Sequence, residues 1–206
     1  MNKFFLITTP IIETWDMNKH NTLMLGEWCN TFEKKELIQN LRNNKILDYH
    51  WENNDKVSKD YSNLNYFGDK ILDTLVGNLN DFHKEKKSKI YWKIVLSNWL
   101  YTFIHILFDR WETIQKAFKD YDIEATRTLN IRNEDMVPQS IENFIQLTHQ
   151  DKWNHFIYSE IMKKCFSKKI KFEEIYITEK DDEYVKHFEE RISLKKKFFF
   201  KIYYFS

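Results

Sequence analysis

Small residues are scarce in this chain of 206 residues, which contains 3 Gly, 2 Pro and only two Ala. Glycine-rich loops cradle phosphates in dinucleotide-binding and P-loop proteins, because a backbone without side chains can approach a phosphate closely. Neither the Gly-x-Gly-x-x-Gly pattern nor the P-loop pattern occurs in this sequence. We therefore expect no cofactor on this chain.

Cysteine is equally scarce, and the two cysteines are Cys29 and Cys165. They lie far apart and form no Cys-x-x-Cys pair, which excludes a disulfide framework and a zinc site built on such pairs. The seven histidines lack metal-ligand spacing, and no His-Glu-x-x-His motif is present. We therefore expect no metal site, and a reducing, cytoplasmic setting is the simplest interpretation.

An excess of charge of either sign is also missing, because 32 basic residues balance 31 acidic ones. This balance argues against a dedicated nucleic-acid binder, which carries a strongly basic face. The longest stretch without a charged residue, 94–108, has 15 residues. A transmembrane helix needs about 20 apolar residues, so we expect no membrane-spanning segment.

Short apolar runs alternate with helical patterns along the chain. We expect strands over 3–9, 22–25, 45–49, 124–131 and 171–178. Helical periodicity and N-capping residues predict helices over 33–43, 55–83, 90–118, 140–149, 151–166 and 181–192. This alternation predicts an α/β, Rossmann-like lobe with a largely parallel sheet and long helices. Helix 90–118 should be the most buried long element, with Ile94, Trp99, Phe103 and Leu107 facing inward.

The chain divides at residue 192 in this interpretation. Residues 1–192 form a single α/β lobe, and residues 193–206 form an irregular tail of lysines and aromatic residues without helical periodicity. The tail is typical of a truncated or frameshifted chain. The alternative is a basic, aromatic segment that contacts the inner face of a membrane peripherally.

Three segments that follow the first three predicted strands place a tryptophan beside a glutamate or a histidine. They are 8–15, 25–29 and 48–51. Ligands of parallel α/β sheets bind at the carboxyl ends of the strands. Glutamate and histidine take protons from hydroxyl groups, and an indole offers a flat apolar surface to a sugar ring. The candidate proton acceptors are Glu13, Glu27 and His50, and the candidate cleft walls are Trp15, Trp28 and Trp51.

Two further residues are candidates for the same site. Gly26 follows a predicted strand, where a close ligand approach excludes a side chain. Arg110 is one of only five arginines, and it follows the long uncharged stretch. Its planar guanidinium either holds an anionic group of the substrate or braces the cleft. A surface ion pair with Asp109 is the purely structural alternative.

Taken in order, the segments TTPIIETW, LMLGEWC, ILDYHW, the FDRWE helix and DKWNHFIYSEI resemble one protein family. It is a family of transferases encoded in bacterial surface-polysaccharide gene clusters and first labelled from a Leptospira genome. The resemblance covers about residues 4–190. The matching positions are Thr8, Thr9, Glu13, Thr14, Trp15, Leu25, Gly26, Glu27, Trp28, Cys29, Tyr49, His50, Trp51, Asp109, Arg110, Trp111 and Glu112.

Family members are much longer than this chain and look like two-lobe glycosyltransferases. The resemblance therefore implies that this chain is the N-terminal lobe, which holds a sugar acceptor, with Thr8 and Thr9 among the substrate-binding residues. A C-terminal lobe would hold the nucleotide-sugar donor. We expect the chain alone to be inactive, because transfer requires both substrates in reacting geometry.

Two other functions are compatible with the same residues. One is a non-catalytic remnant or interaction module, which folds but turns nothing over. The other is the transfer of a different group, such as an acyl or phosphoryl group. If the next reading frame downstream encodes the C-terminal motifs of the family, the chain is a split or frameshifted product. A donor screen on the full-length protein would show whether a sugar or another group is transferred.

Overall fold

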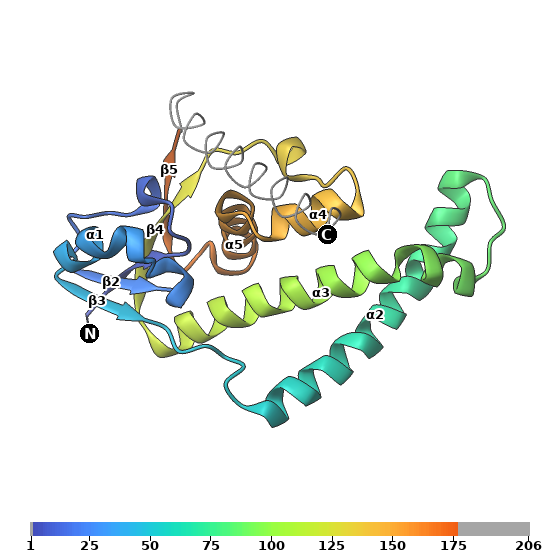
Figure 1. Ribbon diagram of the computed structural model, residues 1–206, viewed down its shortest axis with the longest axis horizontal. Helices are drawn as coiled ribbons and strands as arrows, with labels where there is room; N and C mark the ends of the chain where they lie inside the picture. Colours follow the sequence, from blue (N-terminus) through green and yellow to red (C-terminus); the bar gives the residue numbers. More distant parts are fainter. Residues whose placement is uncertain (1, 177–206) are drawn as a thin grey trace, which may run out of the picture.

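The computed structural model describes residues 2–176 and contains one five-stranded sheet (Figure 1). All neighbouring strands are parallel, and their order is β3-β2-β1-β4-β5. The strands are β1 (Phe4–Ile7), β2 (Asn21–Met24), β3 (Asn43–Ile46), β4 (Ile123–Leu129) and β5 (Lys171–Ile175). This architecture confirms the predicted α/β, Rossmann-like lobe.

The sheet is buried on both faces, as its central strand shows. Phe4 and Leu6 of β1 point to one face, and Phe5 and Ile7 point to the other, because side chains alternate along a strand. The first face packs against the end of α3 (Lys89–Asp120) and against α5 (Asp151–Phe166). The second face packs against α1 (Lys35–Asn40) and the 3-10 turns that follow β1 and β2.

A long helical hairpin connects β3 to β4. It consists of α2 (Asn54–His83) and α3, and Figure 1 shows it extending away from the sheet. The Asn53 side chain caps α2 and the Ser88 side chain caps α3. A further helix, α4 (Ile141–Thr148), lies beside α5, and Ser140 caps it.

The two hairpin helices pack closely where Gly68 meets Tyr101. A Cβ at Gly68 would lie 2.7 Å from the Tyr101 ring, so this crossing needs a residue without a side chain. Around it, an apolar cluster is shared between the helices and includes Leu64, Leu72 and Leu100. The hairpin therefore has a core of its own, separate from the core of the sheet.

The prediction for the long apolar helix is only partly right. Ile94 is 76% exposed, and Trp99, Phe103 and Leu107 are half-buried. The first half of α3 extends beyond the sheet and packs on α2 and on Phe144 of α4, so its remaining face, with Ile94, points to solvent. The buried positions of the whole helix α3 are Trp92, Leu100, Ile104, Asp109, Thr113, Ile114 and Ala117.

Two other expectations concern the ends of the chain and the membrane. None of the helices within residues 2–176 is long and apolar enough to cross a membrane. The predicted helix 181–192 and the predicted tail 193–206 lie outside the described residues.

Candidate functional site

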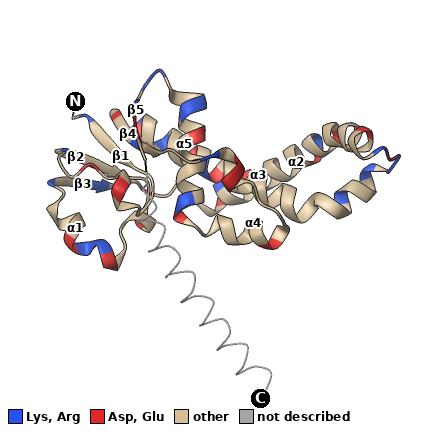
Figure 2. Cartoon of the chain, turned by 90° about the horizontal axis from the view of Figure 1, so that it is seen from above, with Lys and Arg blue, Asp and Glu red and all other residues tan. Residues whose placement is uncertain are grey.

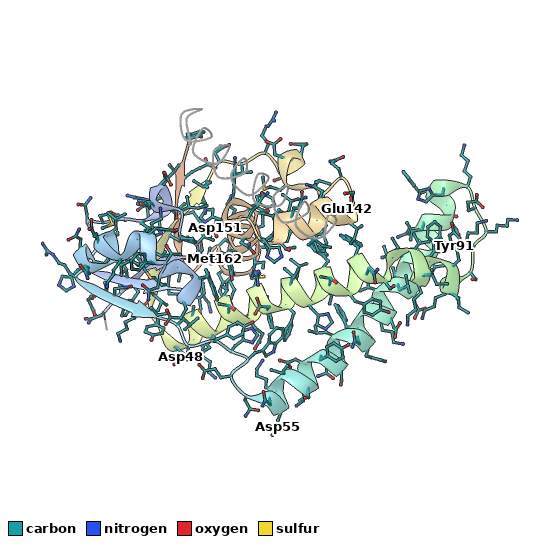
Figure 3. All side chains as sticks on the ribbon, in the orientation of Figure 1. Asp48, Asp55, Tyr91, Glu142, Asp151 and Met162 are labelled. Atoms are coloured by element: carbon teal, nitrogen blue, oxygen red, sulfur yellow. The ribbon has the colours of Figure 1, made fainter. Side chains whose placement is uncertain are left out.

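A cleft of ≈ 550 Å³ lies at the carboxyl edge of the sheet, where the segments after β2 and β3 meet the middle of α3. Figure 3 labels Asp48 at this edge, close to the end of α3 nearer the sheet. Ligands of parallel α/β proteins bind at this edge. The lining residues are Gly26, Glu27, Trp28, Ile46, Leu47, Asp48, Tyr49, Glu52, Asp109 and Arg110.

Asp109 organises one wall of the cleft. Its Oδ1 accepts a hydrogen bond of 2.6 Å from the Tyr49 hydroxyl and lies 3.0 Å from His50 Nε2. Its Oδ2 accepts from the Arg110 guanidinium. Burial alone would raise the pKa of Asp109, but the hydrogen bonds from His50 and Tyr49 and the charge of Arg110 hold this pKa below its usual value. Asp109 is therefore a buried carboxylate with three donors around it.

The contacts with Asp109 also fix the hydrogen bonding of Tyr49 and His50. Burial, and then the hydrogen bond to Asp109, raise the pKa of Tyr49 well above its usual value, so its hydroxyl stays protonated. Because Asp109 is ionised, His50 Nε2 donates to it. The Nδ1 atom of His50 is buried and has no hydrogen-bond partner within residues 2–176. Trp51 and Phe108 pack against the His50 ring, at centroid distances of 4.7 and 6.4 Å.

Arg110 connects α3 to α5. Besides its contact with Asp109, it donates from Nε and Nη2 to Asn154 Oδ1, over 3.2 and 2.9 Å. Asn154 is itself fixed by two hydrogen bonds to backbone carbonyls, those of Thr148 and Gln150. The guanidinium also lies over the Tyr158 ring, 5.7 Å from its centroid. Most of its donors are thus occupied within the protein, which favours the bracing role over binding of an anion.

Trp28 presents a fixed aromatic face to the cleft. Its indole Nε1 donates to the Thr8 carbonyl over 3.0 Å, and its ring is stacked on Tyr158 with planes 7° apart. The ring lies directly over Gly26, where a Cβ would be 2.3 Å from it. We expected a ligand to approach Gly26 closely, but the side chain that does so is the Trp28 indole. Trp28 remains 36% exposed, so part of its surface is available to a ligand.

Replacing Gly26 with alanine should displace the Trp28 ring and cost about 1–3 kcal/mol of stability, as overpacking of a close contact does. Urea unfolding would measure the loss. Gly77→Ala is the matched control, because nothing lies within 4 Å of a Cβ at Gly77 in helix α2. That change should stabilise the protein by about 0.5–1 kcal/mol, since alanine is the better helix former. Equal stability of Gly26→Ala and the wild type would contradict the role given to Gly26.

The remaining polar side chains of the cleft are acidic. Glu27, Asp48 and Glu52 are exposed, and within residues 2–176 no cation forms an ion pair with any of them. Glu27 only accepts a hydrogen bond of 3.2 Å from Asn30 Nδ2. Arg110 is the only basic residue among the lining residues, and the charge of Lys116 acts on Asp48 and Glu52 from nearby. Carboxylates outnumber cations around the cleft, so it suits a neutral ligand rich in hydroxyl groups better than an anion. Within the described residues, no group of His, Cys, Asp or Glu is arranged to hold a metal ion.

The other predicted site residues lie outside the cleft lining. Glu13 is exposed in the 3-10 turn Ile12–Thr14 after β1. Trp15 is 2% exposed in the core beneath that turn, and its Nε1 donates to the Thr9 carbonyl. Trp51 is half-buried and donates to Asp60 of α2 over 2.9 Å. Of the three tryptophans, only Trp28 lines the cleft.

Thr8 and Thr9 are buried at the end of β1, next to β4. There, Thr8 Oγ1 lies 2.7 Å from His155 Nδ1, and the Leu129 amide donates to His155 Nε2 over 3.3 Å. The crevice between β1 and β4 is where the strand order reverses, which is the usual ligand position in such folds. Here the imidazole of α5 occupies that position. The Thr9 hydroxyl is buried, and nothing in the described part of the chain forms a hydrogen bond with it.

Sequence reasoning missed several residues that build the cleft. Tyr49 and Asp109 lie within the matched motifs, but neither was assigned a role in the site. Asp48 and Glu52 flank the YHW motif, and their position after a strand was the available signal. Asn154 and Tyr158 are on α5, and no local pattern in the sequence places them against Arg110.

One comparison with known proteins identifies a family. Residues 4–204 match the family described as LIC12162 family transferase. Neither a curated protein nor a solved structure matches the chain. The match extends over nearly the whole chain, including both the cleft and the hairpin. The chain therefore belongs to the LIC12162 family of transferases.

Proposed function

We propose that the cleft binds the acceptor of a sugar transferase that acts in surface-polysaccharide assembly. In this proposal the chain is the N-terminal, acceptor-side lobe, and a further lobe binds the nucleotide-sugar donor. The observation that carries the proposal is the exposed face of Trp28 beside three carboxylates, Glu27, Asp48 and Glu52, that form no ion pair within the described part of the chain. Carboxylates accept hydrogen bonds from sugar hydroxyls, and an indole packs against the apolar face of a sugar ring.

Glu27 is the general base in this proposal. It is the one candidate proton acceptor that both lines the cleft and is exposed to solvent. During transfer, the acceptor hydroxyl oxygen would form a bond to the anomeric carbon of the donor while the bond to the nucleoside diphosphate breaks. Glu27 would take the proton of that hydroxyl, and the leaving diphosphate would carry away the electron pair.

His50 and Arg110 are positioning residues in this scheme. Both contact Asp109, which in turn holds the Tyr49 hydroxyl at the cleft surface. Arg110 also links this wall to Tyr158, on which Trp28 stacks. The Tyr49 wall and the aromatic face of Trp28 are thereby supported by one connected set of side chains. Both cysteines are free, which fits the proposed cytoplasmic setting.

Binding of neutral glycans to the 206-residue chain tests this proposal without requiring a donor. Saturation-transfer NMR against a panel of neutral mono- and oligosaccharides would find a ligand, and titration would give its Kd. Two cleft variants are Glu27→Gln and Trp28→Ala. Two matched controls are Glu13→Gln, an exposed glutamate after β1, and Trp111→Ala, a tryptophan that is also 36% exposed but lies outside the cleft.

Each cleft variant should raise Kd about tenfold, equivalent to about 1.4 kcal/mol, whereas the controls should leave Kd unchanged. Equal losses in Glu13→Gln and Glu27→Gln would overturn the assignment of the base. If none of the neutral glycans bound the wild-type chain, the cleft would not be an acceptor site, and the interaction-module alternative would gain support.

A further inference from the structure

The tip of the α2–α3 hairpin carries large apolar side chains that contact little of the protein. Ile90 is 72% exposed, Ile94 is 76% exposed, and Phe82 is 81% exposed. Tyr91 and Val95 are also exposed, and all five belong to the end of α2 or to the first two turns of α3. We call these five residues the apolar tip. Figures 1 and 3 show that it lies at the end of the hairpin away from the sheet, with Tyr91 labelled.

The turn beneath the apolar tip is well ordered by hydrogen bonds. The Asn80 side chain donates to the Lys87 carbonyl and accepts from the Lys87 amide, each over 3.0 Å. It also accepts from the Trp92 indole over 2.9 Å. Trp92, Leu79 and Leu75 pack between the two helices. Phe82 and Tyr91 contact the neighbouring rings of His83 and Trp92. The hairpin core is otherwise complete without the apolar tip, so its exposed surface is not explained by packing within the described residues.

Lysines surround the apolar tip, as Figure 2 shows at the turn between α2 and α3. The segment 81–95 contains five lysines and two acidic residues. Lys87, Lys89 and Lys93 pair with Glu85, Asp73 and Asp69. Within residues 2–176, no carboxylate forms an ion pair with Lys84 or Lys86. With Asp69 and Asp73 included, the five lysines face four carboxylates. The tip therefore combines exposed apolar groups with two lysines, Lys84 and Lys86, that form no ion pair within residues 2–176.

We propose that the apolar tip and its lysines bind the surface of a bilayer that contains anionic lipids. Apolar side chains insert at the boundary between headgroups and acyl chains, while flanking lysines contact anionic headgroups. The helices of the hairpin are too polar to span the bilayer, so the contact is peripheral.

Two observations favour a bilayer over a second protein chain. On the face of α3 that carries Ile90 and Ile94, Asn98 and Thr102 continue with polar groups after the second turn. Five side chains are also few, because a stable protein interface uses roughly 20–30 residues a side. A small set of exposed apolar side chains such as the apolar tip suits shallow insertion into the surface of a bilayer. Along α3, about 1.5 Å per residue places the tip on the order of 30 Å from Arg110 at the cleft, so the two surfaces can be tested separately.

Co-sedimentation of the full chain with vesicles tests the proposal. One set of vesicles contains equal parts of phosphatidylcholine and phosphatidylglycerol, and the other contains phosphatidylcholine alone. The variants are Ile90→Asp with Ile94→Asp, and Lys84→Gln with Lys86→Gln. The matched control is Ile145→Asp on α4, an isoleucine that is 51% exposed and lies outside the hairpin. All positions are exposed, so thermal unfolding should show unchanged stability.

The wild type and Ile145→Asp should bind the anionic vesicles, and the isoleucine variant should lose about tenfold or more in partitioning. Raising the salt concentration from about 0.1 M to about 1 M shortens the Debye length from about 10 to about 3 Å, so it should weaken binding, as should the lysine variant. Undiminished binding of the isoleucine variant would overturn the proposal and point to another part of the chain. A concentration-dependent dimer, seen by light scattering without vesicles and lost in that variant, would overturn it in favour of self-association.

Discussion

Replacing Asp109 with alanine should lower the free energy of unfolding by about 3–5 kcal/mol, the cost of breaking a buried charged pair by removing one partner. The carboxylate is 8% exposed and accepts hydrogen bonds from Tyr49, His50 and Arg110. Without it, the Arg110 charge and the His50 Nε2 hydrogen lose their partner in a largely buried place. Urea unfolding at neutral pH measures the change from the shift of the midpoint.

Two other variants make this test specific. Asp109→Asn keeps an oxygen for Tyr49 and His50 but turns an amide donor toward Arg110, so we expect a smaller loss, about 1.5–3 kcal/mol. Asp120→Ala removes a carboxylate from the exposed Lys116–Asp120 pair of the same helix and should cost less than about 1 kcal/mol. If Asp109→Ala lost no more stability than Asp120→Ala, the proposed supporting role of Asp109 in the cleft would be wrong.

The α/β architecture could be predicted from the sequence because each strand and helix of the sheet core has a recognisable local pattern of apolar and capping residues. β1 and β2 are short apolar runs, and alternation with capped helices identified the parallel α/β class. β3 was placed too late, over 45–49 instead of Asn43–Ile46. It lies at the edge of the sheet and begins with two asparagines, one of which bonds to Asn21 over 2.7 Å. A reading based on apolar runs cannot find such a polar edge strand.

The cleft was harder to predict because its contacts join distant parts of the chain. Glu27, Trp28 and Arg110 were found from their positions after a strand or an apolar stretch. Tyr49 and Asp109 are 60 positions apart, and Arg110 and Asn154 are 44 positions apart. Such pairs leave no periodicity in one sequence. The same limit explains why Trp15 and Trp28, which both follow strands beside a glutamate, lie in the core and at the cleft respectively.

Acidification from pH 7 to pH 4 should remove about 3 kcal/mol of stability through His155 alone. Burial lowers the pKa of His155 to about 4, with a smaller contribution from the charge of Lys163. Its two nitrogens also suit the neutral form, because Nε2 accepts from the Leu129 amide and Nδ1 can then donate to Thr8. An unfolded histidine takes up a proton near pH 6.5, so falling pH favours unfolding between about 6.5 and about 4.

Asp109 acts in a different pH window. Its lowered pKa contributes stability that is present above the usual aspartate pKa of 3.8 and is lost only at lower pH. Burial raises the pKa of Asp151, so this carboxyl also titrates above its usual value. Urea unfolding at several pH values between 7 and 4 therefore needs a His155 variant to separate the contribution of the histidine. His155→Gln is the informative variant, because a glutamine amide can accept from Leu129 and donate to Thr8 but does not titrate.

This variant should be less stable than the wild type at pH 7, by about 1 kcal/mol for imperfect hydrogen bonds, but its stability should fall less steeply toward pH 4. His149→Gln removes an exposed histidine at the end of α4 and should keep the wild-type slope. A wild-type slope in His155→Gln would show that another group carries the acid sensitivity. The expected flattening would instead show that a neutral imidazole between β1 and β4 holds the strand ends beside the cleft.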